Sequence, residues 1–347
     1  MWRLAAPWAN SGGLGQYTVG YGWFLVRAAA LAGTLQLRRG FGLVQVNSLP
    51  DVLVFAAAVP RLFGARVLLD LQESTPEFFA TKFGLAMRHP AVRAVVALEQ
   101  LSISFADHVI TPTAQLRDAF VRRGARADKI DVVMDGADES LFRRVPTAPT
   151  DPDRFTLISH GTIEERYGLD TAIGAVALLR DEIPGLRLAI YGDGSDVGRL
   201  RSLAADLGVT DRVSLSDGWV PAGELVRAIS GADVGIVAMK RDAFRDLTLA
   251  GKMFDFIAMG IPMAVSRTRS VEEAFPVGCF ERFESGDAAD LAAAIRRLYA
   301  DPAHRARLVA QATAAAEPYR WPNQRTRYLR TVDRLLRGRE TRRLARR

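Results

Sequence analysis

The chain has 347 residues, 49% hydrophobic and 24% charged, so it is globular rather than disordered and long enough for two ordinary domains. Its net charge is +7, but seven arginines against one Glu between Arg334 and Arg347 give 7 − 1 = +6, which leaves 7 − 6 = +1 for the rest. Charge confined to a tail argues against a nucleic-acid-binding protein, and we expect no nucleic-acid partner. The single cysteine, Cys279, excludes an internal disulfide and fits a reducing compartment.

The first apolar segment, residues 21–37, is predicted to form an amphipathic or buried helix. As a helix it spans roughly 25 Å, which is short of a ~30 Å bilayer core. Arg27 in its middle would also be costly in lipid. We find no signal peptide at the start. We therefore expect a cytoplasmic protein whose arginine-rich C-terminus either contacts anionic lipid at the inner membrane face or is simply solvated.

The next part of the chain alternates short apolar strands with helices, which is typical of a parallel α/β layer. The predicted strands are 43–46, 65–71, 108–112 and 130–134, and the predicted helices are 52–62, 98–106 and 115–124. Residues 146–154 are rich in proline and charge and poor in apolar residues, so they are the predicted linker. We expect one domain from 1–146 plus 322–347, and a second from 147–321.

A second alternating array begins at Phe155. Its predicted strands are 155–159, 186–191, 213–216, 234–238 and 262–266, and its predicted helices are 169–179, 223–230, 251–259, 288–299 and 303–316, with a last helix over 323–336. The sequence thus predicts an α/β protein with two Rossmann-like parallel-sheet domains.

Glycine-containing turns follow two strands of this second array, where an open parallel sheet places its ligands. After the strand at 155–159, Gly161 and Thr162 open a turn in which the backbone can approach a ligand closely, and Arg166 can pair with a diphosphate. After the strand at 186–191 comes Gly192-Asp193-Gly194. Either turn alone is a weak signal, because ordinary βα turns look the same.

The third and strongest signal lies between Asp246 and Asp255. Asp246, Lys252 and Asp255 surround the start of the helix predicted over 251–259. Lys252 and Asp255 are three residues apart and share a helix face. A lysine there can neutralise a leaving diphosphate, and a carboxylate can accept two ribose hydroxyls. The alternative is a surface ion pair. Three such features along one array predict an anionic, nucleotide-like ligand.

These segments resemble the group 1 (family 4) retaining glycosyltransferases, which have the GT-B fold. The resemblance rests on Gly161-Thr162 with Arg166 and Gly168, on Gly192-Asp193-Gly194, and on residues 249–256 followed by 259–262, which are similar to the family's donor motif Leu-Pro-x-Lys-Leu-Phe-Glu-Tyr … Gly-x-Pro-Val. Residues 43–51, 70–73 and 133–138 are similar to N-terminal landmarks of the family. The resemblance implies two domains facing a cleft, with the last helix returning to the N-terminal domain.

The resemblance also implies roles for individual residues. Arg166 and Lys252 would neutralise the departing diphosphate and Asp255 would bind the ribose. Other donor-binding residues would be Gly161, Thr162, Gly192, Asp193, Gly194, Trp219, Val220, Asp246, Thr248, Leu249, Ala250 and Gly251. Trp219 and Val220 would line the base. Gln72 and Glu73 would contact the acceptor or sugar. A nucleotide-sugar donor and an unidentified acceptor are the expected partners, and no cofactor or metal is implied.

Four positions depart from the family pattern. Thr162 stands where the family has Arg, Tyr167 where it has Lys, Asp255 where it usually has Glu, and Gln72 where many relatives have His. Nothing before Leu43 resembles the two strands that normally open the fold, so we expect a shortened N-terminal domain. Two alternatives to a transferase follow: a catalytically degenerate nucleotide-sugar-binding partner, and a sugar-nucleotide epimerase. The four histidines are too scattered in the sequence to form a metal site.

Overall fold

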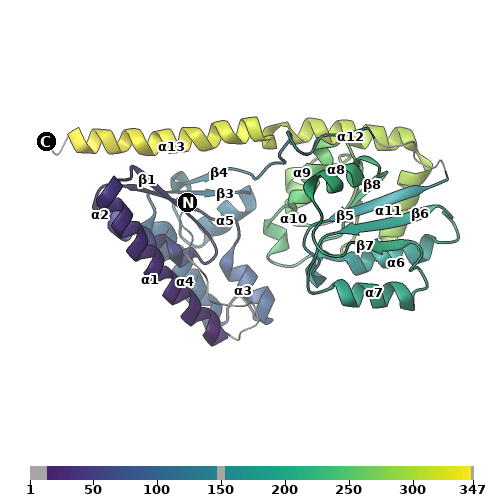
Figure 1. Cartoon of the computed structure of the whole chain (residues 1–347), viewed down its shortest axis with the longest axis horizontal. Helices are drawn as coiled ribbons and strands as arrows, with labels where there is room; N and C mark the ends of the chain where they lie inside the picture. The colour runs from purple at the N-terminus through teal and green to yellow at the C-terminus, as the bar shows by residue number, and fades with distance from the viewer. Residues whose placement is uncertain (1–13, 147–152, 345–347) are drawn as a thin grey trace. The chain divides into compact units, whose positions relative to one another are not determined.

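The computed structural model describes residues 14–146 and 153–344, which form two compact units (Figure 1). Unit 1 holds residues up to Met134 together with those from Arg325 onward, and unit 2 runs from Asp135 to Gln324. The structure thus places the boundaries at 134/135 and 324/325, whereas the sequence predicted 146/147 and 321/322. Residues before the predicted linker belong to unit 2 because Val145 N–H donates to Ser230 Oγ at 3.1 Å. Most of that linker, 147–152, lies outside the described residues.

Unit 1 is built on a four-stranded parallel sheet in the order β1-β2-β3-β4. The strands are β1 (Leu43–Asn47), β2 (Arg66–Asp70), β3 (His108–Thr111) and β4 (Ile130–Val132). The helices are α1 (Leu14–Arg39), α2 (Ala58–Leu62), α3 (Thr75–Phe83), α4 (Pro90–Phe105), α5 (Ala114–Arg122) and most of α13 (Trp321–Leu344), with short 3-10 turns η1 (Asp51–Ala57) and η2 (Ala127–Lys129). The four predicted strands and the helix predicted over 115–124 are present. The helix predicted over 52–62 is divided into η1 and α2, the one predicted over 98–106 is only the second half of α4, and α3 was not predicted.

Two long helices complete unit 1. The predicted helix at 21–37 is confirmed as part of α1, where Gly33 packs against the Val59 side chain of α2. Helix α13 packs on the sheet, as expected of the last helix: Tyr328 lies against a cluster of Leu68, Ile110 and Val133. Thr331 Oγ1 also donates to Asp131 Oδ2 at 2.6 Å.

Unit 2 is built on a six-stranded parallel sheet in the order β10-β9-β8-β5-β6-β7. The strands are β5 (Phe155–His160), β6 (Leu186–Tyr191), β7 (Val213–Leu215), β8 (Val234–Val237), β9 (Met263–Ser266) and β10 (Glu281–Phe283). Its α-helices are α6 (Leu169–Leu179), α7 (Val197–Asp206), α8 (Ala222–Ser230), α9 (Gly251–Ala258), α10 (Arg269–Ala274), α11 (Ala288–Ala300) and α12 (Pro302–Ala316), and its 3-10 turns are η3 (Glu165–Tyr167), η4 (Arg245–Leu247) and η5 (Glu317–Tyr319). Helices α7 and α10 and strand β10 were not predicted.

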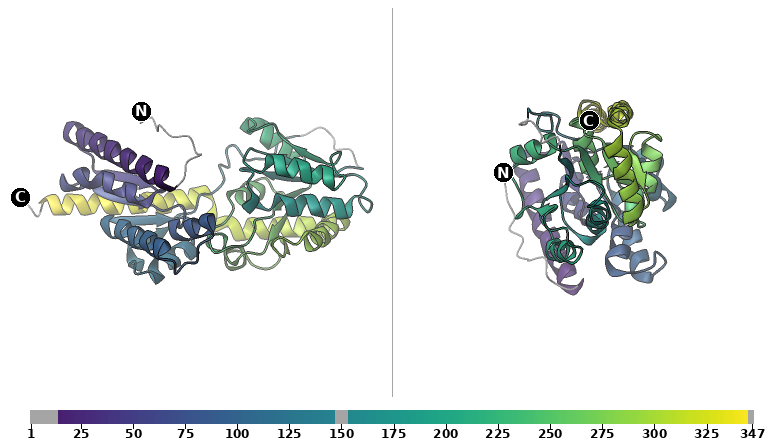
Figure 2. Two further views of the ribbon diagram at one scale, coloured as in Figure 1. Left: turned by 90° about the horizontal axis from the view of Figure 1, so that it is seen from below. Right: turned by 90° about the vertical axis from the view of Figure 1, so that its right-hand side faces the viewer.

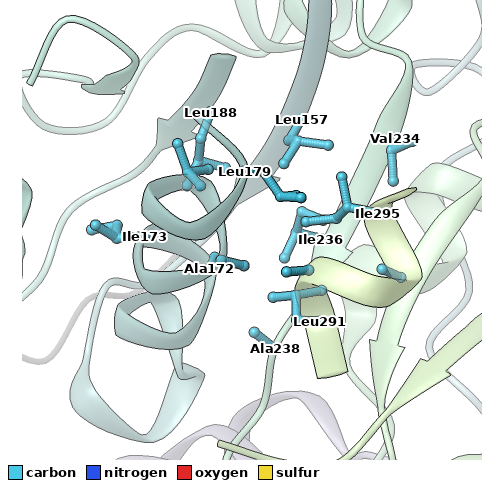
Figure 3. Packing of buried hydrophobic residues seen from close by; sticks show 14 of the residues in the cluster. Leu157, Ala172, Ile173, Leu179, Leu188, Val234, Ile236, Ala238, Leu291 and Ile295 are labelled. Carbon is cyan, nitrogen blue, oxygen red and sulfur yellow. The ribbon is translucent and has the colours of Figure 1, made fainter. Parts of the chain in front are cut away.

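Helices cover this sheet on both sides (Figure 2). Figure 3 shows one layer of the core, where Leu179 of α6 and Leu291 and Ile295 of α11 pack with Leu157 and Ile236 of the sheet. The strand order reverses between β5 and β8, which are neighbours. The predicted fold class of two Rossmann-like parallel-sheet units is therefore confirmed. In the described part of the chain, no helix combines the length and apolar character needed to cross a membrane.

Candidate donor site in unit 2

Because β5 and β8 are neighbours, the turn at Gly161 and the segment from Asp246 to Asp255 lie close together. Beyond the carboxyl end of β5, Gly161 has a left-handed φ of +108°. A Cβ atom at this position would lie 3.6 Å from Lys252 Cε and 3.7 Å from Lys252 Nζ. Lys252 is the second residue of α9, which follows β8. The lysine amine therefore lies directly over the β5 turn, at the place where open α/β sheets bind their ligands.

Three cations surround the aromatic ring of Tyr167. Lys252 Nζ lies 5.1 Å from the ring centroid, Arg245 Cζ 5.0 Å and Arg166 Cζ 5.6 Å. Arg166 also pairs with Glu164 at 2.7 Å. Burial and, to a smaller extent, the positive charge of Arg245 lower the pKa of Lys252 to about 8, while Asp255 opposes the shift. Positive potential is therefore concentrated at the switch point of the sheet.

Asp255 lies beside His160, the last residue of β5. Its Oδ2 is 3.6 Å from His160 Nε2, too far for a hydrogen bond, and this buried nitrogen has no partner among the described residues. Burial raises the pKa of Asp255 to about 7, against the attraction of Lys252. Burial, together with the charge of Lys252, lowers the pKa of His160 to about 3, so the imidazole is neutral. Phe142 stacks on this imidazole with ring centroids 6.3 Å apart.

The second sequence signal packs against the first. Ile163 N–H donates to the Asp193 carbonyl at 2.8 Å. A Cβ atom on Gly192 would lie 1.8 Å from the Gly161 carbonyl oxygen, and one on Gly194 would lie 2.0 Å from that of Ile163. Both glycines are thus required by the close approach of the two turns. Asp193 Oδ1 accepts from Gly194 N–H at 2.8 Å, so it stabilises its own turn.

Comparison with known families agrees with this geometry. Residues 154–301 match the model of glycosyl transferases group 1, and residues 1–136 match a glycosyl transferase 4-like domain. The chain contains a group 1 glycosyltransferase domain.

Its sequence relatives are enzymes of this family. It is 32% identical over 238 residues to the D-inositol 3-phosphate glycosyltransferase of Acidothermus cellulolyticus, covering 64% of this chain and 52% of the relative. It is 31% identical over 194 residues to the GDP-mannose-dependent alpha-(1-6)-phosphatidylinositol monomannoside mannosyltransferase of Mycolicibacterium smegmatis, covering 55% of this chain and 50% of the relative. The chain spans about half the length of the curated relatives that it matches.

Solved glycosyltransferase structures share the fold. The sucrose-phosphate synthase of Thermosynechococcus elongatus aligns with a TM-score of 0.75 and 20% identity over 97% of this chain and 83% of that chain. Anabaena HepE in complex with UDP-glucose aligns with a TM-score of 0.71 and 18% identity over 88% of this chain and 81% of that chain.

Three residues of this candidate site were missed in the sequence. Arg245 and Tyr167 complete the cation cluster, and His160 faces Asp255. The only sequence signal was position: His160 directly precedes Gly161, and Arg245 directly precedes Asp246. The sequence does not show which side chains surround Arg245, so it could not identify this residue as part of the site.

The other residues predicted to bind the donor differ in their contacts and in their exposure. Asp246 does not face Lys252: its Oδ1 accepts from Arg241 Nε at 3.1 Å and from Arg269 N–H at 2.8 Å. Ala250 is the N-cap of α9 and provides no side-chain cap. Thr248 Oγ1 is buried with no hydrogen-bond partner among the described residues. Half-buried Thr162, Leu249 and Val220, with exposed Gly251 and Trp219, complete the predicted set.

The predicted acceptor residues lie in unit 1, where β1 and β2 end. Gln72 Nε2 donates to Asp70 Oδ1 at 2.7 Å, and Gln45 Nε2 donates to Asp70 Oδ2 at 3.1 Å. Gln45 Oε1 in turn accepts from Tyr328 of α13 at 2.6 Å. Gln72 is thus fixed by a network, and Glu73 beside it is half-buried. In the described ranges, no group of three or more His, Cys, Asp and Glu side chains is arranged to hold a metal ion.

Proposed function

We propose that this chain transfers a sugar from a nucleoside diphosphate sugar to an acceptor hydroxyl, with retention of configuration. The observation that carries the proposal is the position of Lys252, whose amine lies over Gly161 beside Arg166 at the switch point of a parallel sheet. Backbone and cationic groups converge there on one volume, as binding a phosphate requires.

In the proposed reaction, the bond from the sugar C1 to the diphosphate oxygen breaks and the electron pair leaves with the diphosphate. Lys252 and Arg166 stabilise the charge that develops on this leaving group. The acceptor hydroxyl attacks the same face of the sugar and gives its proton to the departing oxygen, so no protein nucleophile takes part. Asp255 binds the ribose hydroxyls, while Trp219 and Val220 lie along the base.

For the acceptor we propose a hydroxyl compound bound at the network of Gln45, Asp70 and Gln72. Its amide and carboxylate groups suit polyol hydroxyls. The names of two relatives include inositol 3-phosphate and a phosphatidylinositol mannoside, so inositol-containing acceptors are the first to test.

The two alternatives that the sequence left open, an epimerase and a degenerate binding partner, receive little support. An epimerase needs a titrating acid and base at the sugar, whereas the network of Gln45, Asp70 and Gln72 proposed to contact the sugar or acceptor contains no histidine. A degenerate binding partner differs from the transferase only in lacking turnover, which the experiment below measures.

We also propose peripheral contact with anionic membranes. The tail from Arg334 carries +6. A second feature lies in unit 1, where Leu62 at the end of α2 is 84% exposed and the next residue, Phe63, is 59% exposed, beside exposed Arg61. An apolar pair beside basic residues suits a lipid interface with anionic headgroups. Sedimentation with anionic but not neutral vesicles tests this, and equal binding to both would contradict it.

Calorimetry with UDP, GDP and ADP, followed by assays of transfer from UDP-glucose and GDP-mannose to inositol 3-phosphate, tests the main proposal. Binding of one nucleotide that is lost in Lys252→Ala and Asp255→Ala, together with product formation, is expected. Binding without turnover of any donor would favour the degenerate partner, and no binding would overturn both.

A further inference from the structure

Arg245 is a buried cation without a counter-charge. The residue lies in η4 and is 7% exposed, and its Cζ lies 5.0 Å from the ring centroid of Phe244 and 5.0 Å from that of Tyr167. Its Nε has no hydrogen-bond partner within the described ranges, and no carboxylate there lies within 4.0 Å of its guanidinium. Buried charges in proteins are normally paired, because an unpaired one is costly.

The acids close to Arg245 in sequence are already engaged. Asp246 binds the side chain of Arg241 and the backbone N–H of Arg269. Asp242 Oδ1 accepts the backbone N–H of Arg245 itself at 2.6 Å, which fixes the main chain and leaves the guanidinium unpaired.

The charged neighbours of Arg245 increase the free-energy cost of burying its guanidinium, because they are also cations. Lys252 and Arg166 share the Tyr167 ring with it, and the charge of Arg245 disfavours that of Lys252. Contacts of a cation with aromatic rings are weak compared with the cost of burying an unpaired ion. The rings therefore offset the burial of this charge only in part, and an anionic ligand would supply the missing counter-charge.

We propose that Arg245 binds the diphosphate of the donor, supplying the positive charge that the family places at positions 162 and 167. This inference rests on the proposed function. At those two positions the chain has Thr162 and Tyr167. The Tyr167 ring contacts both Arg245 and Lys252, so the residue that stands in place of the family's lysine contacts two other cations. Three cations at one place favour a ligand with two or more negative charges over a monophosphate.

The test compares Arg245→Gln and Arg245→Lys with the control Arg241→Gln, which removes a half-exposed arginine of the same loop that has a carboxylate partner. Binding of inorganic pyrophosphate and of UDP or GDP is measured by calorimetry, and thermal unfolding is measured without ligand. We expect Arg245→Gln to weaken pyrophosphate and nucleotide binding by about 10–100-fold. Arg245→Lys, which keeps the charge and loses the planar fork, is expected to be intermediate.

Thermal unfolding separates a ligand-binding role from a structural one. Removing an unpaired buried cation should leave the melting temperature of the free protein unchanged or raise it. If Arg245→Gln binds pyrophosphate as tightly as wild type, or if it lowers the melting temperature as loss of a structural arginine would, the inference is overturned. Nucleotide binding by the wild type would then still support the proposed function. A wild type that binds neither pyrophosphate nor a nucleotide would contradict both the inference and the proposed function.

Discussion

His160 Nε2 faces Asp255 Oδ2 at 3.6 Å, with no hydrogen bond between them and no other partner for the nitrogen among the described residues. A ligand hydroxyl within hydrogen-bond reach of both atoms would satisfy both of them. In the proposed function, this pair is the site for the ribose hydroxyls of the donor, next to the proposed phosphate-binding amine of Lys252.

Asp255→Asn should separate ribose binding from phosphate binding. Hydrogen bonds to charged groups contribute about 1.5–3 kcal/mol, so we expect UDP or GDP affinity to fall by roughly 10–100-fold while pyrophosphate affinity changes little. Calorimetry with both ligands measures this, with Asp181→Asn, an exposed carboxylate, as control. An Asp255→Asn protein that binds the nucleotide like wild type would remove Asp255 from the site.

The pKa of Lys252 makes nucleotide binding dependent on pH. The groups near its amine are Arg245, which lowers the pKa, Asp255, which raises it, the Tyr167 ring and neutral His160. A bound diphosphate favours the charged amine, so binding takes up a proton above pH 8. We expect affinity to be roughly fivefold weaker at pH 9 than at pH 8. In Lys252→Arg, which stays charged, this dependence should disappear; its persistence would assign it to another group.

The sequence predicted the parts of the site that local spacing determines. Helix α6 spans 169–179 as predicted, because its apolar periodicity is strong. Helix α3 was missed: its Glu77 is buried and pairs with Arg123, the residue that follows α5, at 2.7 Å. That stabilisation is tertiary and leaves no local signal. Lys252 and Asp255 could be identified because they are three residues apart on one helix. The cations around Tyr167 come from separate segments, so no local spacing indicates that they lie together.

Burial raises the pKa of Asp51 in unit 1 to about 6, although Thr75 Oγ1 donates to it at 2.8 Å. Because the folded pKa lies above the unfolded one, this group's stabilisation is complete below the unfolded pKa and is lost as pH rises through about 6. Between pH 5 and 8 the loss is about 1.4 kcal/mol. Asp51→Asn should remove this part of the pH dependence in urea unfolding at the two pH values. Equal slopes for variant and wild type would contradict the assignment.

Two glycines of unit 2 offer a matched pair. Gly192→Ala places a Cβ 1.8 Å from the Gly161 carbonyl oxygen at a φ of +146°, and we expect a loss of about 2 kcal/mol or more in the free energy of unfolding. Gly198→Ala, in α7, has no heavy atom within 4 Å of the added Cβ and should leave stability unchanged or slightly raised. Chemical unfolding measures both, and similar effects of the two changes would be inconsistent with the packed turns.

The contact between the turns at 161–163 and 192–194 has a consequence for how this site can vary among relatives. Neither turn can be lengthened or given a side chain on Gly192 or Gly194 without moving the other, since their backbones are in direct contact. Insertions that change donor preference should therefore occur elsewhere, and substitutions in these two turns should be inherited together as a single unit of sequence variation.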